Sequence, residues 1–197
     1  MINQLKNRLQ AQRTVGDAAQ TVLRDIIALH GAEYGNLQMP VRGELVIVAQ
    51  SGLSAPFLRT FKSVTKEDSC ACGRAYRSGT PVIVVDVDVD PDFAPYREAA
   101  RQAGYRSVQS TPLMTKRRKL VGMVSTLFAQ VHRPTKIEME ILAEYSVLAA
   151  EHFNTLALDS NLAEHAKRLN AELYAEIEAI EEPVFRDAAI VAERNPN

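Results

Sequence analysis

The sequence predicts an α+β fold in which helices flank a central antiparallel sheet. The first observation is the segment 104–129, which resembles two long strands joined by a short basic turn. Its β-branched, aromatic and apolar residues suit a half-buried pleated surface. The second is a pair of helical periodicities, one before this hairpin and one after it. The third is an acidic and aromatic loop directly before the hairpin, which we expect to fold over one face of the sheet.

Length and composition limit the classes of protein that fit. A chain of 197 residues, 46% of them hydrophobic, can bury one core, so we expect one domain with extra helix. The formal net charge of -1 gives no electrostatic reason to expect nucleic acid or a membrane as partner. No apolar run approaches the roughly 18 residues that span a bilayer. The first residues also lack the apolar centre of a secretory signal.

The two cysteines, Cys70 and Cys72, bear on the cellular compartment. One residue separates them, which is too close for a relaxed structural disulfide, and two cysteines are too few for a zinc site. We therefore expect a reducing, cytoplasmic compartment.

The N-terminal part predicts helix and then a hairpin. Residues 1–13 are expected to form a helical extension, and residues 14–30 carry apolar side chains at helical spacing up to a stop at Gly31. We interpret His30, at the end of this apolar stripe, as a packed core residue rather than a ligand. Strands within 37–49 form the first hairpin.

Two short helices and a strand follow the first hairpin. Residues 55–61 predict a helix rich in phenylalanine, and Asp68–Ser69 predicts the N-cap of a second helix that ends at Gly79. Gly73 within that helix costs about 1 kcal/mol relative to Ala, so we expect close packing there. Residues 80–85 form an apolar strand.

Four aspartates alternate through the next loop, at positions 86, 88, 90 and 92. A calcium-binding EF-hand does not fit, because Pro91 stands where that loop needs Gly and Arg97 where it needs Glu. We expect the acids to favour the N-terminal end of the following turn instead, without a metal. Phe93 and Tyr96 come next. Their rings either line a small-ligand site or complete the hydrophobic core. The residues alone leave both readings open.

The central hairpin and the C-terminal helix follow a helix over 97–103 that stops at Gly104. Pro112 cannot donate to a sheet ladder, so we expect a bulge or a local edge there. The basic turn 116–119 is interpreted as solvated. Thr135 and Glu138 form a capping box at the start of a long amphipathic helix.

Residues 156–182 predict a further amphipathic helix. Apolar residues from Leu162 to Ile180 are spaced 4, 3, 4, 4 and 3 apart, which is typical of a coiled-coil seam, and 159–161 suggests a break before it. We expect this seam to pair with a second subunit in preference to the N-terminal helix. Pro183 is expected to stop the helix, leaving 183–197 as a loosely ordered tail.

The run from about Thr14 to Phe153 resembles a GAF domain, a bacterial sensory module. The segments that carry the resemblance are Ser69–Ala75, VIVVDVDVDPDF at 82–93, AGYRSVQSTPL at 103–113 and KLVGMVSTLF at 119–128. The resemblance implies a domain over 14–155 with five or six antiparallel strands. It also implies that the N- and C-terminal helices pack on one face and that a ligand pocket lies on the other. The similar subgroup occurs in bacterial two-component and light- or gas-responsive regulators.

Departures from known GAF subfamilies narrow the expected function. The cyclic-nucleotide signature is missing, and residues 96–107 contain neither the Cys nor the His of bilin-binding members. The strand 105–110 lacks the cysteine of the reductases of free methionine sulfoxide. His132 and His152 are poor axial ligands for haem, because both follow the central hairpin. We therefore expect a non-enzymatic domain. The sequence carries no haem, bilin or metal signature, so its cofactor is unknown.

The resulting hypothesis is a sensor that binds a small molecule and signals through its terminal helices. A homodimer is expected, with a histidine kinase or response regulator as a possible partner. The alternatives are a ligand-free interaction module and, less favoured, a redox switch at Cys70 and Cys72. The candidate ligand-binding residues are Phe57, Phe61, Phe93, Tyr96 and Tyr105 as apolar walls, Asp86, Arg106 and Gln109 as polar groups, and Cys72 near the mouth.

Overall fold

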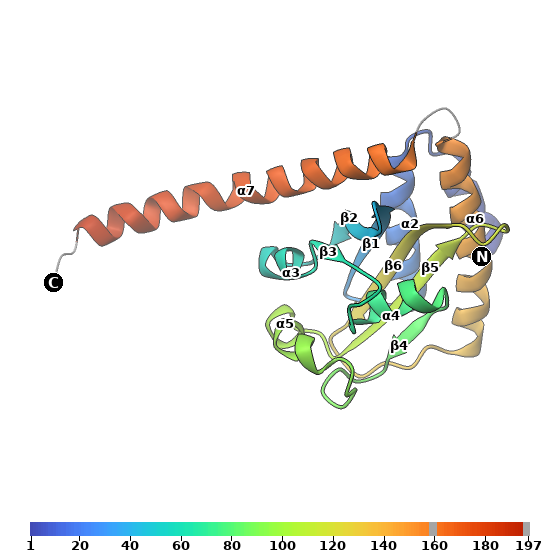
Figure 1. The fold of residues 1–197 in the computed structure, drawn as a ribbon, viewed down its shortest axis with the longest axis horizontal. Coiled ribbons are helices and arrows are strands. Elements are labelled where there is room, and N and C mark those ends of the chain that lie inside the picture. Colours follow the sequence, from blue (N-terminus) through green and yellow to red (C-terminus); the bar gives the residue numbers. More distant parts are fainter. Residues whose placement is uncertain (158–160, 195–197) are drawn as a thin grey trace.

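A computed structural model describes residues 1–157 and 161–194 of the chain, with backbone alone for 181–194. Six strands form one antiparallel sheet in the order β3-β2-β1-β6-β5-β4. Helices pack on one face of the sheet, and shorter helices and loops cover the other (Figure 1). The predicted α+β fold is therefore confirmed. The strands are β1 (Tyr34–Val41), β2 (Glu44–Ser51), β3 (Ser63–Val64), β4 (Val82–Val84), β5 (Ser107–Met114) and β6 (Leu120–Phe128).

The helical layer consists of α1 (Ile2–Gln10), α2 (Val15–His30) and α6 (Lys136–Leu156). Helix α2 begins where the Thr14 hydroxyl accepts from the Asp17 amide, and it ends at left-handed Gly31. Helix α6 begins with the predicted capping box, in which both reciprocal bonds between Thr135 and Glu138 are present. Local sequence signals thus set both ends of α2 and the start of α6.

A buried carboxylate connects the three helices of this layer. Asp25 of α2 is 4% exposed. It accepts from the Arg8 guanidinium of α1 at 2.7 Å and from the Tyr145 hydroxyl of α6 at 2.6 Å. Leu5 and Leu9 of α1 are also buried in the same core. The N-terminal helix is therefore docked on the domain.

The opposite face of the sheet carries a cover of short elements. These are α3 (Ala55–Thr60), α4 (Ala71–Ser78), the 3-10 turn η1 (Ala94–Tyr96) and α5 (Arg97–Ala103). Their apolar side chains form a second core with the side chains that β2, β5 and β6 present on this face. The sheet therefore separates two cores, one under the long helices and one under the cover.

Helix α7 (Leu162–Arg194) crosses β2 and extends past α3, away from the domain (Figure 1). Ala166 joins the core of the helical layer, and Tyr174 joins the core of the cover. Leu169 lies against Gly16 of α2. The seam predicted for a second subunit is thus largely occupied by its own domain, although Ile180 is 73% exposed.

The prediction that Pro183 stops the last helix is wrong, because α7 continues to Arg194. A proline inside a helix removes one backbone hydrogen bond and costs about 3 kcal/mol, yet strong helix formers precede this one. The predicted break at 159–161 falls mostly on residues 158–160, which lie outside the described part, as do 195–197. The Asn161 side chain accepts from the Ala163 amide at 3.0 Å and so caps α7.

Pro112 lies at a local edge, as predicted. Strand β4 pairs with β5 from Val84↔Val108 to Val82↔Ser110 and goes no further. The missing donor of Pro112 therefore interrupts no ladder on that side, and a bulge follows between Leu113 and Met114. Within the described residues, no helix has the length and apolar character needed to cross a membrane.

Candidate ligand pocket

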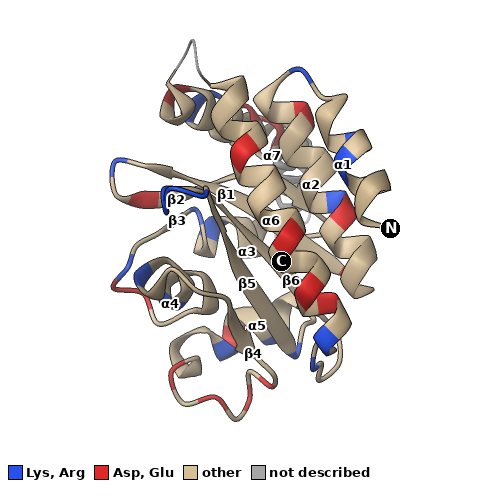
Figure 2. Ribbon diagram, turned by 90° about the vertical axis from the view of Figure 1, so that its right-hand side faces the viewer, with Lys and Arg blue, Asp and Glu red and all other residues tan. Residues whose placement is uncertain are grey.

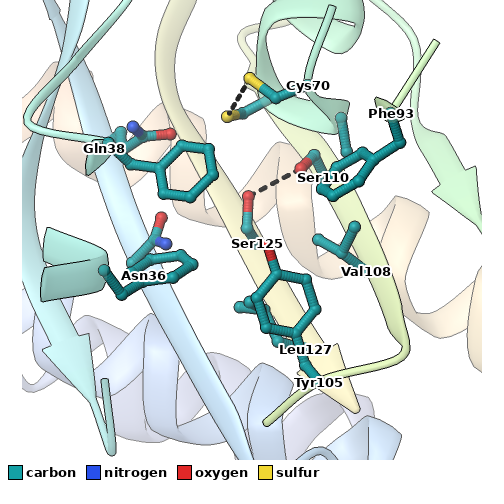
Figure 3. A pocket seen from close by; sticks show the side chains of 13 residues that line it. Asn36, Gln38, Cys70, Phe93, Tyr105, Val108, Ser110, Ser125 and Leu127 are labelled. Carbon is teal, nitrogen blue, oxygen red and sulfur yellow. Dashed lines mark hydrogen bonds between the residues drawn. The ribbon is translucent and has the colours of Figure 1, made fainter. Parts of the chain in front are cut away.

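A small cavity lies between the sheet and its cover (Figure 3). Its volume is about 20 Å³, room for a molecule the size of water. Strands β1, β5 and β6 supply its floor, and α3, α4 and the loops around α5 supply its roof. The lining residues are Asn36, Gln38, Phe57, Phe61, Cys70, Ala71, Cys72, Phe93, Tyr105, Val108, Ser110, Ser125 and Leu127.

A row of polar side chains crosses the floor of the cavity. Asn36, Ser125 and Ser110 are register partners on the adjacent strands β1, β6 and β5. The hydroxyls of Ser110 and Ser125 lie 2.7 Å apart and form a hydrogen bond. Gln38 lies two residues along β1 from Asn36, so both side chains point to the same face. The alternating residues Leu37 and Met39 belong to the core of the helical layer.

The two amides of this floor have unused hydrogen-bonding capacity. Asn36 is 4% exposed and Gln38 is 1% exposed. Asn36 Oδ1 and both polar side-chain atoms of Gln38 have no hydrogen-bond partner among the described residues. A buried amide without a partner costs about 1–3 kcal/mol. The cavity therefore presents two acceptors and one amide donor group to whatever occupies it.

Aromatic rings form the roof and one wall. Phe57 lies 4.6 Å from Phe61 and 5.9 Å from Tyr105, between ring centroids. Phe93 meets Tyr105 edge-on at 6.5 Å. These four predicted residues line the cavity. Tyr96 lies behind them, where it stacks on Phe61 at 5.5 Å without lining the cavity.

The start of α4 brings both cysteines to the cavity. Cys70, not the predicted Asp68–Ser69 pair, is the N-cap. The Asp68 carboxylate instead accepts from the Thr65 amide at 2.7 Å and from the Tyr96 hydroxyl at 2.9 Å. Both carboxylate oxygens of Asp68 are therefore bonded to the preceding turn and to the cover, and neither accepts from the first amides of α4.

The two thiols are in contact and differ in acidity. Cys70 Sγ and Cys72 Sγ lie 3.4 Å apart, and both residues are buried. A hydrogen bond from Cys72 and bonds from backbone amides at the start of α4 lower the pKa of Cys70. The bond to Cys70, together with burial, raises the pKa of Cys72. Cys70 is therefore the more acidic thiol of the pair.

Gly73 explains how α4 approaches the turn before it. A Cβ on Gly73 would lie 2.3 Å from the Asp68 carbonyl oxygen and 2.9 Å from that of Thr65. No side chain fits there, so the expected close packing is confirmed. The glycine lets the turn 65–68 lie against the first turn of α4 and fixes the position of Cys70.

Two predicted polar residues do not reach the cavity. The Arg106 guanidinium pairs with Asp86 at 2.6 Å and with Asp88 at 3.2 Å, and its side chain is 44% exposed. Arg106 lies just before β5, so the alternation of side chains along a strand does not set where it points. Its side chain points to the acidic loop after β4, which is red at the bottom of Figure 2. The predictions for Asp86 and Arg106 as cavity groups are corrected accordingly.

The sequence prediction also places Gln109 on the wrong face of the sheet. It alternates with the cavity-lining Val108 and Ser110, so it points to the helical layer. There its amide nitrogen lies 3.4 Å from Met139 Sδ of α6. Its place in the predicted site is therefore corrected to the opposite face.

The acidic loop is held by arginines and by its own backbone. Asp90 pairs with Arg74 of α4 at 3.0 Å and accepts from the Phe93 amide at 3.0 Å. Within the described residues, no three His, Cys, Asp or Glu side chains are grouped so that they could hold a metal ion. The carboxylates thus position the loop that carries Phe93 and Tyr96.

The family model of the GAF domain matches residues 12–154. The chain therefore belongs to the GAF domain family. Among proteins of curated function, none matches the chain.

Solved structures support the same fold. The GAF domain of a phosphoenolpyruvate-protein phosphotransferase from Coxiella burnetii aligns with a TM-score of 0.67 at 15% identity, over 80% of this chain and 93% of that one. A free methionine-R-sulfoxide reductase from Neisseria meningitidis, in complex with its substrate, gives 0.62 at 16%, over 84% and 89%. A domain of a putative two-component sensor histidine kinase from Sinorhizobium meliloti gives 0.60 at 17%, over 80% and 99%.

Proposed function

We propose that this GAF domain is a non-enzymatic sensor in a bacterial signalling system. A small polar molecule binds between the sheet and its cover, and its binding changes how α7 lies on the domain. The observation that carries the proposal is the group of buried, unpaired amide atoms on Asn36 and Gln38. A ligand with both donors and acceptors satisfies these atoms and removes their desolvation cost.

The contacts of α7 support the coupling between pocket and helix. Phe57 lines the cavity, and the next residue, Leu58, accepts a hydrogen bond through its carbonyl from the Tyr174 hydroxyl of α7. Asn170 of α7 donates to the Ile47 carbonyl of β2 at 2.8 Å. A movement of α3 therefore changes a direct contact of α7.

The size of the cavity makes that movement part of binding. A metabolite larger than a few atoms enters a space of about 20 Å³ only when Phe57 and Phe61 move outward. Both belong to α3 or its C-terminal end. A ligand shifts α7 to the extent that it binds the displaced arrangement of α3 better than the closed one.

The output of the sensor is carried by the part of α7 beyond the domain. Exposed Ile180 begins this overhang, which offers a surface for a second subunit or for a histidine kinase or response regulator. The sensor histidine kinase among the similar structures supports that class of partner. The candidate ligand contacts are Asn36, Gln38, Phe57, Phe61, Cys72, Phe93 and Tyr105, with Tyr96 supporting Phe61.

A ligand-free interaction module is the second candidate. The observation that favours it is the small volume of the cavity, about 20 Å³, which the rings of Phe57, Phe61, Phe93 and Tyr105 line. In that case the sheet and cover are a rigid support, and α1 and α7 bind the partner.

Native mass spectrometry of freshly purified protein distinguishes the two candidates. The sensor predicts a small mass that stays bound under gentle conditions and leaves on denaturation. The same spectrum gives the number of subunits. A clean apo protein, with no thermal shift in a metabolite screen but with a shift on adding a partner, would replace the sensor with the interaction module.

A further inference from the structure

The cavity places two thiols in contact beside the unpaired amides of its floor. Cys70, Cys72, Asn36 and Gln38 all line this one space, and Figure 3 shows Cys70 at the top of the view with Gln38 and Asn36 on its left. The two sulfurs already lie 3.4 Å apart. To form a bond, the two sulfurs approach to about 2.05 Å. With one residue between the cysteines the disulfide is strained, as is typical of reducible rather than structural disulfides.

We infer that Cys70 and Cys72 are a peroxide-reactive pair, and that hydrogen peroxide oxidises them to an intramolecular disulfide inside the cavity. This inference rests on the proposed function, because it assigns a ligand class and a chemistry to the same pocket. It concerns stoichiometric modification of the chain rather than catalysis.

The size and polarity of the cavity match this oxidant. Hydrogen peroxide has two heavy atoms, which suits a volume of about 20 Å³ better than an alkyl hydroperoxide does. Its two O–H groups can donate to Asn36 Oδ1 and Gln38 Oε1, and its oxygens can accept from Gln38 Nε2. These three atoms are the buried polar atoms of the cavity lining that have no partner among the described residues.

The reaction balances with peroxide alone. The Cys70 thiolate attacks one peroxide oxygen, the O–O bond breaks, and Cys70 becomes a sulfenic acid while hydroxide leaves. That hydroxide takes the proton of Cys72 and becomes water. The Cys72 thiolate then attacks the Cys70 sulfur, the S–O bond breaks, and a second hydroxide takes up the proton that Cys70 gave to solvent. Two thiols and one peroxide thus give one disulfide and two waters.

The position of the pair links its oxidation to the cover. Drawing the sulfurs together changes the first turn of α4, where Gly73 lies against the Asp68 backbone. The Asp68 carboxylate holds the hydroxyl of Tyr96, which stacks on Phe61. Oxidation therefore acts on the same cover elements that contact α7.

Mass spectrometry of the reduced full chain tests the inference. Trypsin cleaves after Lys66 and Arg74, so residues 67–74 carry both cysteines in one peptide. We expect hydrogen peroxide to lower the mass of this peptide by about 2 Da. At neutral pH we expect the folded chain to react about tenfold faster than the chain unfolded in urea. We also expect folding to increase the preference for hydrogen peroxide over tert-butyl hydroperoxide.

Variants separate the roles of the two sulfurs and of the amides. Cys72→Ser is expected to accumulate a sulfenic acid at Cys70 that dimedone traps, whereas Cys70→Ser is expected to react about tenfold more slowly than the wild type. Gln38→Leu is expected to slow oxidation. Gln109→Leu, a buried glutamine on the helical face, is the matched control and is expected to leave the rate unchanged.

Three results would overturn the inference: equal rates for the two single cysteine variants, disulfides between chains in place of the internal one, or no preference for the smaller peroxide beyond that of the unfolded chain. The proposed sensor is tested apart from this chemistry. If one of these three results is found while the double variant Cys70→Ser/Cys72→Ser still holds a co-purified molecule in native mass spectrometry, the peroxide chemistry fails and the sensor stands.

Discussion

The Tyr174 hydroxyl of α7 donates a hydrogen bond of 2.5 Å to the backbone carbonyl of Leu58, the residue after the cavity-lining Phe57. The two residues are 116 positions apart in the chain, and the bond is buried. It joins the roof of the pocket to the helix that leaves the domain. Any displacement of α3 by a ligand therefore lengthens, breaks or moves this bond.

Replacing Tyr174 with Phe removes this bond and keeps the ring. We expect a loss of about 1 kcal/mol in the free energy of unfolding, since the Leu58 carbonyl is left buried without its partner. Urea denaturation measures the loss. Tyr76→Phe is the matched control, because both rings carry a lysine ammonium about 5 Å above them. An equal change in both variants would remove the special role of the Leu58 bond.

Replacing Gly73 with Ala tests the close approach that positions Cys70. The new methyl would meet the Asp68 carbonyl at 2.3 Å, so backbone has to move. We expect a loss of about 1–3 kcal/mol in stability, typical of overpacking. Gly16→Ala is the control, because its Cβ meets a flexible Leu169 methyl at 3.1 Å. If Gly73→Ala leaves the midpoint of urea unfolding unchanged, the turn 65–68 can move without a cost in stability.

Replacing Gln38 with Leu separates stability from binding. The change removes two buried polar atoms that have no partner among the described residues, so we expect the ligand-free chain to gain about 1–2 kcal/mol of stability. The sensor hypothesis also predicts that the bound molecule is lost. Gln109→Leu removes a comparable buried amide on the other face and is expected to leave that molecule in place. Thermal unfolding and native mass spectrometry give the two readouts.

Retention of the bound molecule by Gln38→Leu would exclude this amide from the binding site. Loss of the molecule from both variants would indicate a general effect of altering the sheet rather than a contact in the cavity.

Because His30 is buried, we expect the free energy of unfolding to fall in mild acid. Desolvation lowers the pKa of His30 from 6.5 to about 4, while nearby Glu138 raises it and His132 lowers it further. Between pH 6.5 and about 4, the unfolded chain binds more protons at His30 than the folded chain does. The stability that is present above pH 6.5 is therefore lost as the pH falls toward 4. The contribution is at most about 3 kcal/mol.

Urea unfolding of the wild type and of His30→Asn across this pH range measures that contribution. We expect the difference in stability between the two proteins to shrink as the pH falls. Parallel curves would show that His30 titrates in the same way in both states. The 3.1 Å contact of its Nδ1 with the Thr126 hydroxyl confirms that His30 is a packed residue of the core.

The regular part of the fold was predictable because local signals and long-range packing agree there. Thr14 and Gly31 mark the ends of α2, and the capping box marks the start of α6. The end of α7 was not predictable from Pro183, since a proline makes a helix end probable but does not require it. The seam of α7 was assigned to a second subunit because periodicity shows an apolar face without showing what covers it.

The candidate site was predictable for its aromatic roof and not for its polar floor. Phe57, Phe61, Phe93 and Tyr105 line the cavity as predicted. Asn36 and Gln38 alternate with apolar neighbours, a pattern that in the sequence looks like the solvent face of a strand. Only the cover of α3 and α4 turns that face inward. Ser110 and Ser125 were missed because their register is a property of strand pairing.

Hydrogen exchange of α7 tests the coupling of pocket and helix most directly. The measurement compares the backbone amides of residues 166–178 in the protein as purified, with the small molecule that the sensor proposal predicts, and after refolding and dialysis to remove that molecule. We predict that exchange in this segment and in α3 changes together on removal, and that Tyr174→Phe uncouples the two. Identical exchange of α7 in both states, with a change confined to the cavity, would contradict the account.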